Sequence, residues 1–337
     1  MPNHAHAIIL ASRPETIASV DNFAAVDLPI PSLAEGEVLT RTLWLSLDPY
    51  MRGRMVDAPS YAAPVGVGEP MTGETIGEVI ESRDSTIKVG QIVLGARGWA
   101  THLASPASQL TVLQPGAPWQ AYLGVLGMPG ATAFAGLRDI GRPKAGETIV
   151  VSAASGAVGS VVVQLAREAG ARVVGIAGGA DKCNWVRDVL GADACIDYRA
   201  EADLAAALQA ACPSGVDVYW ENVGGDIQKA VFPLLNDFGR MVMCGMIAEY
   251  DGHTAPGPNL MAAVTKRLLI QGLIVLDRAA NFPEWRALGA RLIAEGKLHY
   301  REQIVECLDQ APAALIDLFN ARNDAKIVVR VGEPSLA

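Results

Sequence analysis

A run of small residues, Ala153-Ala154-Ser155-Gly156-Ala157-Val158-Gly159, is the stretch best suited to bind a phosphate. It follows the β-branched run Ile149–Val151 and precedes apolar residues at helical spacing that end at Gly170. Such a turn lets the backbone approach a pyrophosphate, which exposed N–H groups and the helix dipole favour. An alanine stands where the strict pattern has its first glycine, so a plain strand-to-helix turn is the alternative. We interpret this turn as a dinucleotide site formed by Gly156, Ala157, Val158 and Gly159.

A bulky residue at Gly156 or Gly159 would stand between the backbone and the pyrophosphate. We therefore expect such a replacement to prevent cofactor binding while the fold is retained.

The end of the next predicted strand bears on the choice of cofactor. Sites for NAD place an acid about 20 residues beyond the glycine loop, where it accepts from the ribose hydroxyls. Here the strand ends Ala177-Gly178-Gly179, without an acid. An acid would repel a 2′-phosphate and glycine leaves room for one, so the pattern favours NADPH. Asp181 is expected to cap the following helix.

The cysteines and histidines do not have the spacing of a metal site. None of the five cysteines lies in a CxxC pair, and none precedes Cys183. The five histidines also lack ligand spacing. These patterns argue against a disulfide scaffold and against a cysteine-rich zinc site.

The first 125 residues are predicted to be β-rich and irregular. Partial alternation of apolar and polar residues predicts short strands, and Gly and Pro punctuate the region throughout. This pattern suits a small barrel or a set of short sheets. The predicted strands are His6–Leu10, Glu37–Leu47, Thr72–Ser82 and Gly90–Leu94.

From Gly127 onward, strand and helix patterns alternate at the rhythm of βα units, which predicts a doubly wound parallel sheet with right-handed crossovers. After the strand at Ile149–Val151, the further strands are expected at Arg172–Ala177, Ala194–Asp197, Val216–Glu221, Arg240–Gly245 and Leu268–Leu276. After the helix that ends at Gly170, further helices are expected at Lys182–Leu190, Leu204–Ala211, Ile227–Leu235 and Phe282–Glu295.

After Tyr300 the pattern changes back. A helix at Ala311–Asn320 and a strand at Lys326–Val331 are expected to return to the first domain. The predicted domains are therefore 1–125 with 303–337, and 126–302.

Composition limits the class of protein. Half of the 337 residues are hydrophobic, 19% are charged, and the net charge is −9. An acidic chain without a basic stripe is a poor candidate for binding nucleic acid or an anionic membrane. No basic start precedes the short apolar run near the N-terminus, and no window holds the roughly 18 apolar residues of a membrane span. We expect a cytoplasmic protein.

Several stretches together match a known family: LSLDPYMRGRM (Leu45–Met55), GWATH (Gly98–His102), GMPGATAFAGL (Gly127–Leu137), AASGAVGSVVVQLA (Ala153–Ala166), ENVGG (Glu221–Gly225) and CGMIAEY (Cys244–Tyr250). The chain resembles a zinc-free medium-chain dehydrogenase/reductase of the prostaglandin reductase / NADP-dependent alkenal double-bond reductase (curcumin-reductase-like) group. DPYMR with GMPGATA is specific to this group. The resemblance implies a GroES-like, β-rich substrate domain, a doubly wound Rossmann domain that binds NADPH, and a homodimer.

The resemblance also implies further cofactor contacts. Lys182 and Tyr198 match residues that hold the 2′-phosphate, although Lys182 can also be read as a solvated helix charge. Asn222 matches a cofactor-binding asparagine. The remaining matched positions are Cys244, Gly245 and Tyr250 in one loop, Leu273, Ile274 and Val275 in another segment, and Asn323.

The chemistry implied by the resemblance is hydride transfer to the β-carbon of an α,β-unsaturated aldehyde or ketone. Negative charge then develops on the carbonyl oxygen, which needs a donor. Tyr50 and Tyr250 are the phenols predicted at the site, since a phenol donates without carrying charge. The alternative for each is a half-buried structural tyrosine. Arg52 is expected to hold its loop rather than to react.

One position departs from the group. Several members carry a catalytic tyrosine where this chain has Thr265, which places Thr265 among the candidate catalytic residues but leaves the proton donor open. Two other functions stay open: an NADPH quinone oxidoreductase, and a non-catalytic cofactor-binding protein, which the Thr265 departure favours.

Zinc-dependent relatives carry a Gly-His-Glu triplet in the first domain. The corresponding residues here are Thr72-Gly73-Glu74, so the histidine ligand is missing. The sequence therefore predicts a reductase that works without zinc.

Overall fold

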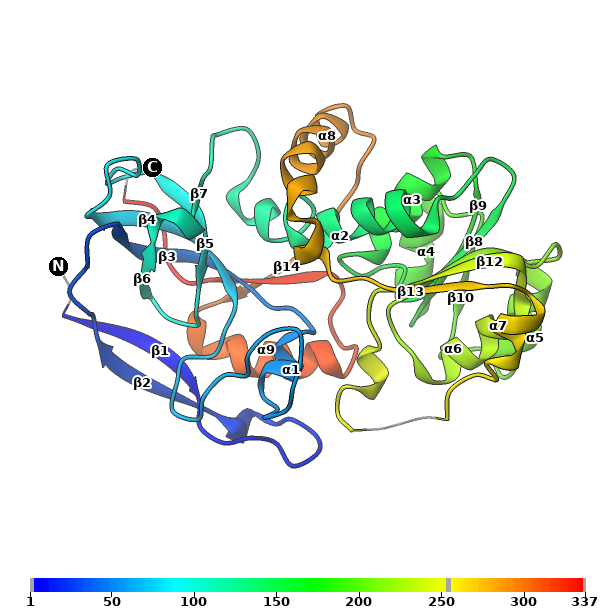
Figure 1. Cartoon of the computed structure of the whole chain (residues 1–337), viewed down its shortest axis with the longest axis horizontal. Helices are drawn as coiled ribbons and strands as arrows, with labels where there is room; N and C mark the ends of the chain where they lie inside the picture. The colour runs from blue at the N-terminus through cyan, green and yellow to red at the C-terminus, as the bar shows by residue number, and fades with distance from the viewer. Residues whose placement is uncertain (1–2, 253–255, 336–337) are drawn as a thin grey trace. The chain divides into compact units, whose positions relative to one another are not determined.

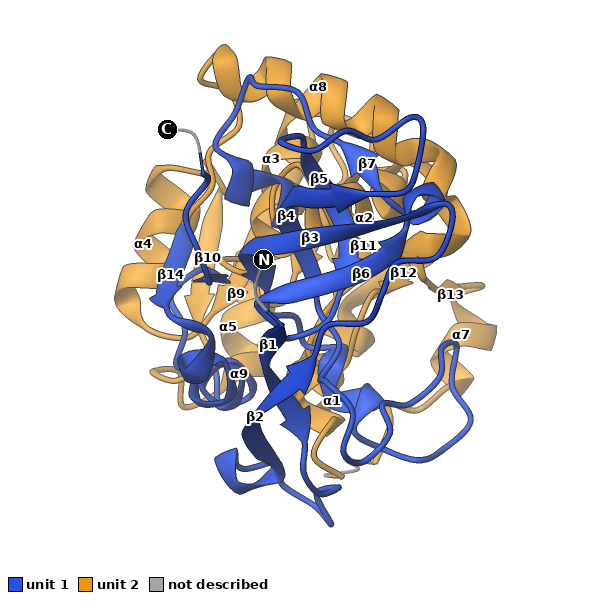
Figure 2. Ribbon diagram, turned by 90° about the vertical axis from the view of Figure 1, so that its left-hand side faces the viewer, with its two compact units in different colours: residues 1–123, 302–337 blue, residues 124–301 orange. Residues whose placement is uncertain are grey.

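A computed structural model of the chain describes residues 3–252 and 256–335. The chain forms two compact units, coloured separately in Figure 2: unit 1 comprises Met1–Leu123 and Glu302–Ala337, and unit 2 comprises Gly124–Arg301. Unit 1 is β-rich and unit 2 is built on a parallel sheet (Figure 1). The predicted fold class is confirmed.

The sheet of unit 2 is wound outward from its middle. Its strands are β8 (Thr148–Val151), β9 (Arg172–Ala177), β10 (Ala194–Asp197), β11 (Val216–Glu221), β12 (Leu235–Met243) and β13 (Leu269–Gly272). All pairings are parallel and the order is β10-β9-β8-β11-β12-β13. The winding direction reverses between β8 and β11, and ligands of such sheets bind at this point, outside the carboxyl ends of the strands.

Helices cover both faces of this sheet, which explains why the central strands β8, β9 and β11 are mostly apolar and buried. The helices are α2 (Met128–Gly136), α3 (Gly159–Glu168), α4 (Ala180–Asp188), α5 (Leu204–Ala211), α6 (Gly225–Val231), α7 (Met261–Thr265) and α8 (Phe282–Ala294) (Figure 1). Leu208 of α5 and Val231 of α6 pack with Val150 and Tyr219 on one face. On the other face, a Cβ on Gly136 would lie 2.4 Å from the Trp220 ring, so α2 lies flush against the sheet.

Three predicted boundaries in unit 2 were wrong. The helix predicted to end at Leu235 stops at Val231, because Pro233 cannot continue it, and β12 begins at Leu235 rather than Arg240. The strand predicted to reach Leu276 ends at Gly272, and Val275 already starts a 3₁₀ turn.

The helix after β9 also begins differently from the prediction. Gly179 is the residue that precedes α4, and Asp181 lies inside the first turn rather than at the cap. An acid in the first turn still complements the helix dipole.

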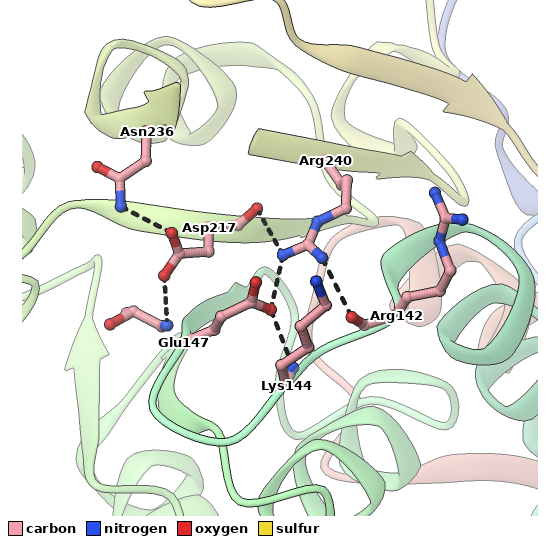
Figure 3. A network of polar contacts seen from close by, with 7 residues as sticks. Arg142, Lys144, Glu147, Asp217, Asn236 and Arg240 are labelled. Carbon is pink, nitrogen blue, oxygen red and sulfur yellow. Dashed lines mark hydrogen bonds and ion pairs between the residues drawn. The ribbon is translucent and has the colours of Figure 1, made fainter. Parts of the chain in front are cut away.

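A polar network fixes the amino ends of β8 and β11 (Figure 3). Asp217 accepts from the Thr148 N–H at 2.8 Å and from the Asn236 amide at 2.9 Å. Arg240 donates to Glu147 at 2.7 Å and to the carbonyl of Arg142 at 3.1 Å. These groups lie at the end of the sheet opposite the expected ligand site and bond to one another, so we assign them a structural role.

Unit 1 is built on an irregular sheet of order β14-β15-β3-β4-β5-β7, with β6 also paired to β3 and a separate antiparallel pair of β1 and β2. The strands are β1 (His4–Leu10), β2 (Phe23–Pro29), β3 (Glu37–Ser46), β4 (Glu74–Ser82), β5 (Ile92–Arg97), β6 (His102–Pro106), β7 (Thr111–Val112), β14 (Glu302–Glu306) and β15 (Lys326–Arg330). The short helix α1 (Met51–Arg54) follows β3, and α9 (Ala311–Phe319) lies between β14 and β15. The last segment returns to this unit because β15 pairs with β3.

The sequence analysis did not identify β2, β6, β7 or β14, which are short or lie at sheet edges. None of the helices in the described residues is long and apolar enough to cross a bilayer.

Candidate cofactor and active site

The small-residue turn after β8 has the shape of an anion cradle. Ala153 adopts a left-handed backbone with φ 46°, and the Gly156 N–H donates to the Ala153 carbonyl at 2.9 Å. Within the described part of the chain, the N–H groups of Ala157 and Val158 donate to no protein group. Unsatisfied N–H groups at the start of α3 are the donors that a pyrophosphate requires.

The two glycines of this turn have different roles. A Cβ on Gly159 would lie 2.2 Å from the Ala153 carbonyl oxygen and 2.9 Å from the Ala154 Cα. Replacement of Gly159 would therefore displace the backbone itself, so a loss of stability is expected at this position in addition to the loss of cofactor binding. A Cβ on Gly156 would meet only Ala153, at 3.1 Å. Gly156 is thus the position at which a side chain tests the cradle without rebuilding it.

The carboxyl ends of β9 and β10 bring three residues together. A Cβ on Gly178 would lie 2.8 Å from the Tyr198 ring and 2.9 Å from Nε of Arg199. Glycine therefore leaves space that an aromatic ring and a guanidinium border. Lys182 lies near the start of α4, which begins two residues after Gly178.

Arg199 is a candidate that the sequence analysis missed. Its guanidinium lies 5.8 Å from the centroid of the Tyr198 ring, and its position directly after Tyr198 is the signal that could have identified it. Asp197 accepts from the N–H groups of Gly179 at 2.8 Å and Arg199 at 3.1 Å. These bonds, the Gly179 bond foremost, lower the pKa of Asp197, whose carboxylate thus shapes the turn.

Asn222 is held in place at the carboxyl end of β11. Its N–H donates to Ser152 Oγ at 2.8 Å and its side-chain amide to the Ser152 carbonyl at 2.7 Å. Its side-chain oxygen accepts from the Trp220 indole at 3.2 Å. Because Ser152 directly follows β8, these bonds join the two loops on either side of the switch point.

The loop after β12 lies against Asn222. A Cβ on Gly245 would be 3.2 Å from the Tyr250 hydroxyl and 3.5 Å from the Asn222 carbonyl oxygen. Burial, followed by the charge of Glu221, raises the pKa of Cys244 to about 12, so this thiol stays protonated and is a poor nucleophile. The structure thus brings Asn222, Gly245 and Tyr250 together, and the predicted cofactor contact of Cys244 stays a prediction.

The segment after β13 is largely buried, whereas Thr265 is exposed. Leu273 and Val275 are buried and Ile274 is half-buried, and the Leu273 N–H donates to the Met243 carbonyl at 3.0 Å. Thr265 is exposed at the end of α7, and its hydroxyl donates within its own helix, to Met261 at 3.3 Å or Ala262 at 3.4 Å. A hydroxyl bonded in this way is poorly placed to serve a substrate, and the catalytic role of Thr265 stays a prediction.

Tyr50 stands in unit 1, directly before α1. It is half-buried against the apolar core that contains Met51 and Trp99. Burial, followed by the charge of Asp48, raises the pKa of Tyr50 above its ordinary value, so the phenol is neutral and able to donate. Arg52 is buried and donates to the Thr16 carbonyl, which fits the expected loop-holding role.

A buried ion pair fixes the loop that carries Tyr50. Lys326 and Asp48 are 6% and 4% exposed, and their side chains lie 2.8 Å apart. The Lys326 ammonium also donates to Ser46 Oγ at 2.7 Å and to the Leu47 carbonyl at 2.6 Å, which uses all three of its hydrogens. The hydroxyl of Ser46 donates to the second oxygen of Asp48.

Asn323 also belongs to unit 1. It is half-buried between α9 and β15, and its amide donates to the Ala325 carbonyl at 2.9 Å. Its predicted cofactor contact stays a prediction.

Across residues 3–252 and 256–335, His, Cys, Asp and Glu side chains form no group of three that could hold a metal ion. His253 lies outside the described residues.

The chain is similar to known reductases over nearly its whole length. A family model described as the N-terminal domain of oxidoreductase matches residues 6–113, and one described as zinc-binding dehydrogenase matches residues 157–295. The NADPH-dependent curcumin reductase of Escherichia coli (strain K12) is 45% identical over 333 residues, covering 96% of both chains. The NADP(+)-dependent 2-alkenal reductase of Nicotiana tabacum is 39% identical over 310 residues, covering 91% of this chain and 90% of that protein. The chain belongs to the medium-chain dehydrogenase/reductase family, in the curcumin, alkenal and prostaglandin reductase group.

A solved structure supports the same assignment. The crystal structure of CurA in complex with NADPH from Vibrio vulnificus has a TM-score of 0.92 at 44% identity, and the match covers 98% of this chain and all of that one. In this medium-chain reductase, the turn at Gly156 and the space at Gly178 are the places where the sequence predicts the dinucleotide. The second family model is described as zinc-binding, whereas Gly73 is predicted from the sequence to stand where zinc-dependent relatives have a histidine.

Proposed function

We propose that this protein is an NADPH-dependent reductase of the C=C bond of α,β-unsaturated aldehydes and ketones. The observation that carries the proposal is the near full-length similarity to a structure solved with NADPH, together with an open cradle at the switch point of unit 2. Bound NADPH supplies the hydride. The residues of this chain hold the pyrophosphate on the N–H groups before α3 and the 2′-phosphate beside Lys182, Tyr198 and Arg199.

On the substrate, the β-carbon receives hydride and the carbonyl oxygen gains negative charge. Tyr50 and Tyr250 are the phenols proposed to donate to that oxygen, and a proton then reaches the α-carbon. No ionised acid is required, because a neutral phenol stabilises an enolate by hydrogen bonding. Zinc is not required in this proposal, and turnover should persist after exhaustive chelation.

The 2′-phosphate contact is tested by changing Lys182. Lys182→Ala should raise the KM for NADPH about tenfold or more and leave NADH kinetics nearly unchanged, since a charge-assisted contact contributes roughly 1.5–3 kcal/mol. Steady-state kinetics with both cofactors provide the measurement. Lys229→Ala is the matched control, because Lys229 is an exposed helix lysine paired with Asp226. An equal loss with both cofactors would assign Lys182 to folding.

The reaction is tested by labelling. With 4-deuterated NADPH and an enone, deuterium should appear on the β-carbon and solvent deuterium on the α-carbon, with the carbonyl retained. An allylic alcohol labelled on the carbonyl carbon would make the protein a carbonyl reductase. Turnover of quinones with no enone reduction would instead support the quinone reductase, and no turnover with tight NADPH binding would support the non-catalytic alternative.

The donor to the enolate oxygen is tested by removing one hydroxyl. Tyr50→Phe should lower kcat about a hundredfold, since one lost donor at an oxyanion typically costs ~3 kcal/mol. Thr265→Val should have a smaller effect because the Thr265 hydroxyl is already bonded within α7. Tyr61→Phe is the control, since Tyr61 is 56% exposed and its ring, like that of Tyr50, lies next to the Arg54 guanidinium. An unchanged kcat in Tyr50→Phe together with a strongly reduced kcat in Thr265→Val would make Thr265, rather than Tyr50, the donor.

We also propose a homodimer formed along β13, in the cytoplasm. β13 is an edge strand of the sheet of unit 2, and Leu269 and Ile270 are each 38% exposed. Met261 and Val264 on α7 are 62% and 70% exposed beside it in sequence. An exposed apolar edge strand invites pairing with another copy. The wild-type chain should have twice the monomer mass in light scattering, and Ile270→Lys should shift it toward the monomer; a monomeric wild type would refute the proposal.

A further inference from the structure

Glu221 is a fully buried carboxylate in unit 2 that the proposed reaction does not use. It is the last residue of β11 and is 0% exposed. Within residues 3–252 and 256–335, no arginine, lysine or histidine forms an ion pair with it. Burying a charge without a cation is costly, so a charged residue at this position requires an explanation.

Four donors surround this carboxylate. One oxygen accepts from Ser152 Oγ at 2.9 Å, from the Val223 N–H at 2.7 Å and from the Gly224 N–H at 3.0 Å. The other accepts from the Tyr219 hydroxyl at 2.7 Å. Burial, followed by the charge of Glu221, raises the pKa of Tyr219, which therefore keeps its hydrogen and donates. Four donors are the surroundings of an ionised carboxylate.

Glu221 also holds the loop after β12. Its backbone carbonyl accepts from the N–H groups of Cys244 at 2.9 Å and Gly245 at 3.1 Å. Its side chain and its backbone thus fix the two loops that follow β11 and β12. A glutamine could make most of these hydrogen bonds, so loop geometry alone does not explain why the residue carries charge.

The position of Glu221 in the sheet indicates which half of the cofactor lies near its charge. The pyrophosphate cradle follows β8, and the space for the 2′-phosphate lies at the ends of β9 and β10. The adenosine half is therefore expected on the β9 side of β8. The nicotinamide half must then extend to the opposite side, over the carboxyl ends of β11 and β12, where Glu221 lies.

We propose that the buried charge of Glu221 selects the oxidation state of the bound cofactor, favouring the positively charged nicotinamide of NADP⁺ over the neutral ring of NADPH. Hydride transfer creates that positive charge, so the same field lowers the energy of the product side of the reaction. A charge shielded from water acts over several ångströms because the surrounding dielectric is low. The inference rests on the proposed function, since it requires that the dinucleotide binds at this switch point.

The test is the ratio of two dissociation constants. Glu221→Gln keeps the size and most hydrogen bonds of the side chain but removes its charge. It should weaken NADP⁺ binding about five- to tenfold more than NADPH binding in calorimetric titrations at one ionic strength, as expected for a unit charge acting through protein. Equal weakening of both would show that Glu221 only positions the loops and would overturn the proposal.

A structural control and a wild-type measurement complete the test. Tyr219→Phe removes one donor while the charge stays, so both constants should change by the same factor. Should Glu221→Gln not fold, the wild type still decides: its Kd for NADP⁺ should not exceed its Kd for NADPH, and a larger Kd for NADP⁺ would overturn the proposal. A wild type that binds neither nucleotide would instead refute the proposed function.

Discussion

Gly156→Val is expected to yield a folded protein that no longer binds NADPH. A Cβ on Gly156 meets only Ala153, at 3.1 Å, so the isopropyl group extends into the open space over the turn. There it would separate a pyrophosphate from the N–H groups of Ala157 and Val158. A charge-assisted hydrogen bond contributes roughly 1.5–3 kcal/mol, so the loss of two should raise the Kd more than about a hundredfold.

Fluorescence titration with NADPH measures this loss, and circular dichroism verifies the fold. Gly116→Val is the matched control: a Cβ there meets nothing within 4 Å, and Gly116 does not have a left-handed φ. Native NADPH affinity in Gly156→Val would show that the cofactor does not use this turn. Gly159→Val should behave differently and lose stability itself, because its Cβ would collide with the Ala153 carbonyl.

Lys326→Met is expected to destabilise the protein by roughly 3–5 kcal/mol, the usual result of leaving one charge of a buried pair without its partner. Asp48 is 4% exposed and would keep only the Ser46 hydroxyl as a donor among its described contacts. Because Asp48 lies two residues before Tyr50, the loop bearing the proposed donor should loosen with it.

Urea unfolding followed by tryptophan fluorescence provides the measurement. The double variant Lys326→Met with Asp48→Asn should recover much of the loss, since no buried charge then lacks a partner. Lys144→Met, at an exposed lysine, controls for the loss of a positive charge. Wild-type stability in Lys326→Met would mean that water reaches Asp48 and that the pair is not buried in solution.

The sequence was sufficient for the features that depend on neighbouring residues. The βα rhythm after Gly127 predicted every strand of the parallel sheet, because an apolar run between turn residues is a local pattern. The glycine turn was recognisable for the same reason, and so was the missing acid at Gly178. The ends of elements were less certain: Pro233 stops α6 early, and β13 ends where Leu273 and Val275 turn inward to be buried.

Residue type and spacing by themselves indicated a doubly wound nucleotide unit and a preference for NADPH, and the family resemblance added two phenols as candidate donors. Only the tertiary structure decided that Gly159 serves the fold, that Arg199 borders Gly178, and that Glu221 lies buried between two loops. It also decided that Lys326 pairs with Asp48 across 278 residues of chain. The physical reason is that burial and hydrogen bonding join groups that are distant in sequence. The sequence alone does not indicate which of its lysines and glutamates become buried.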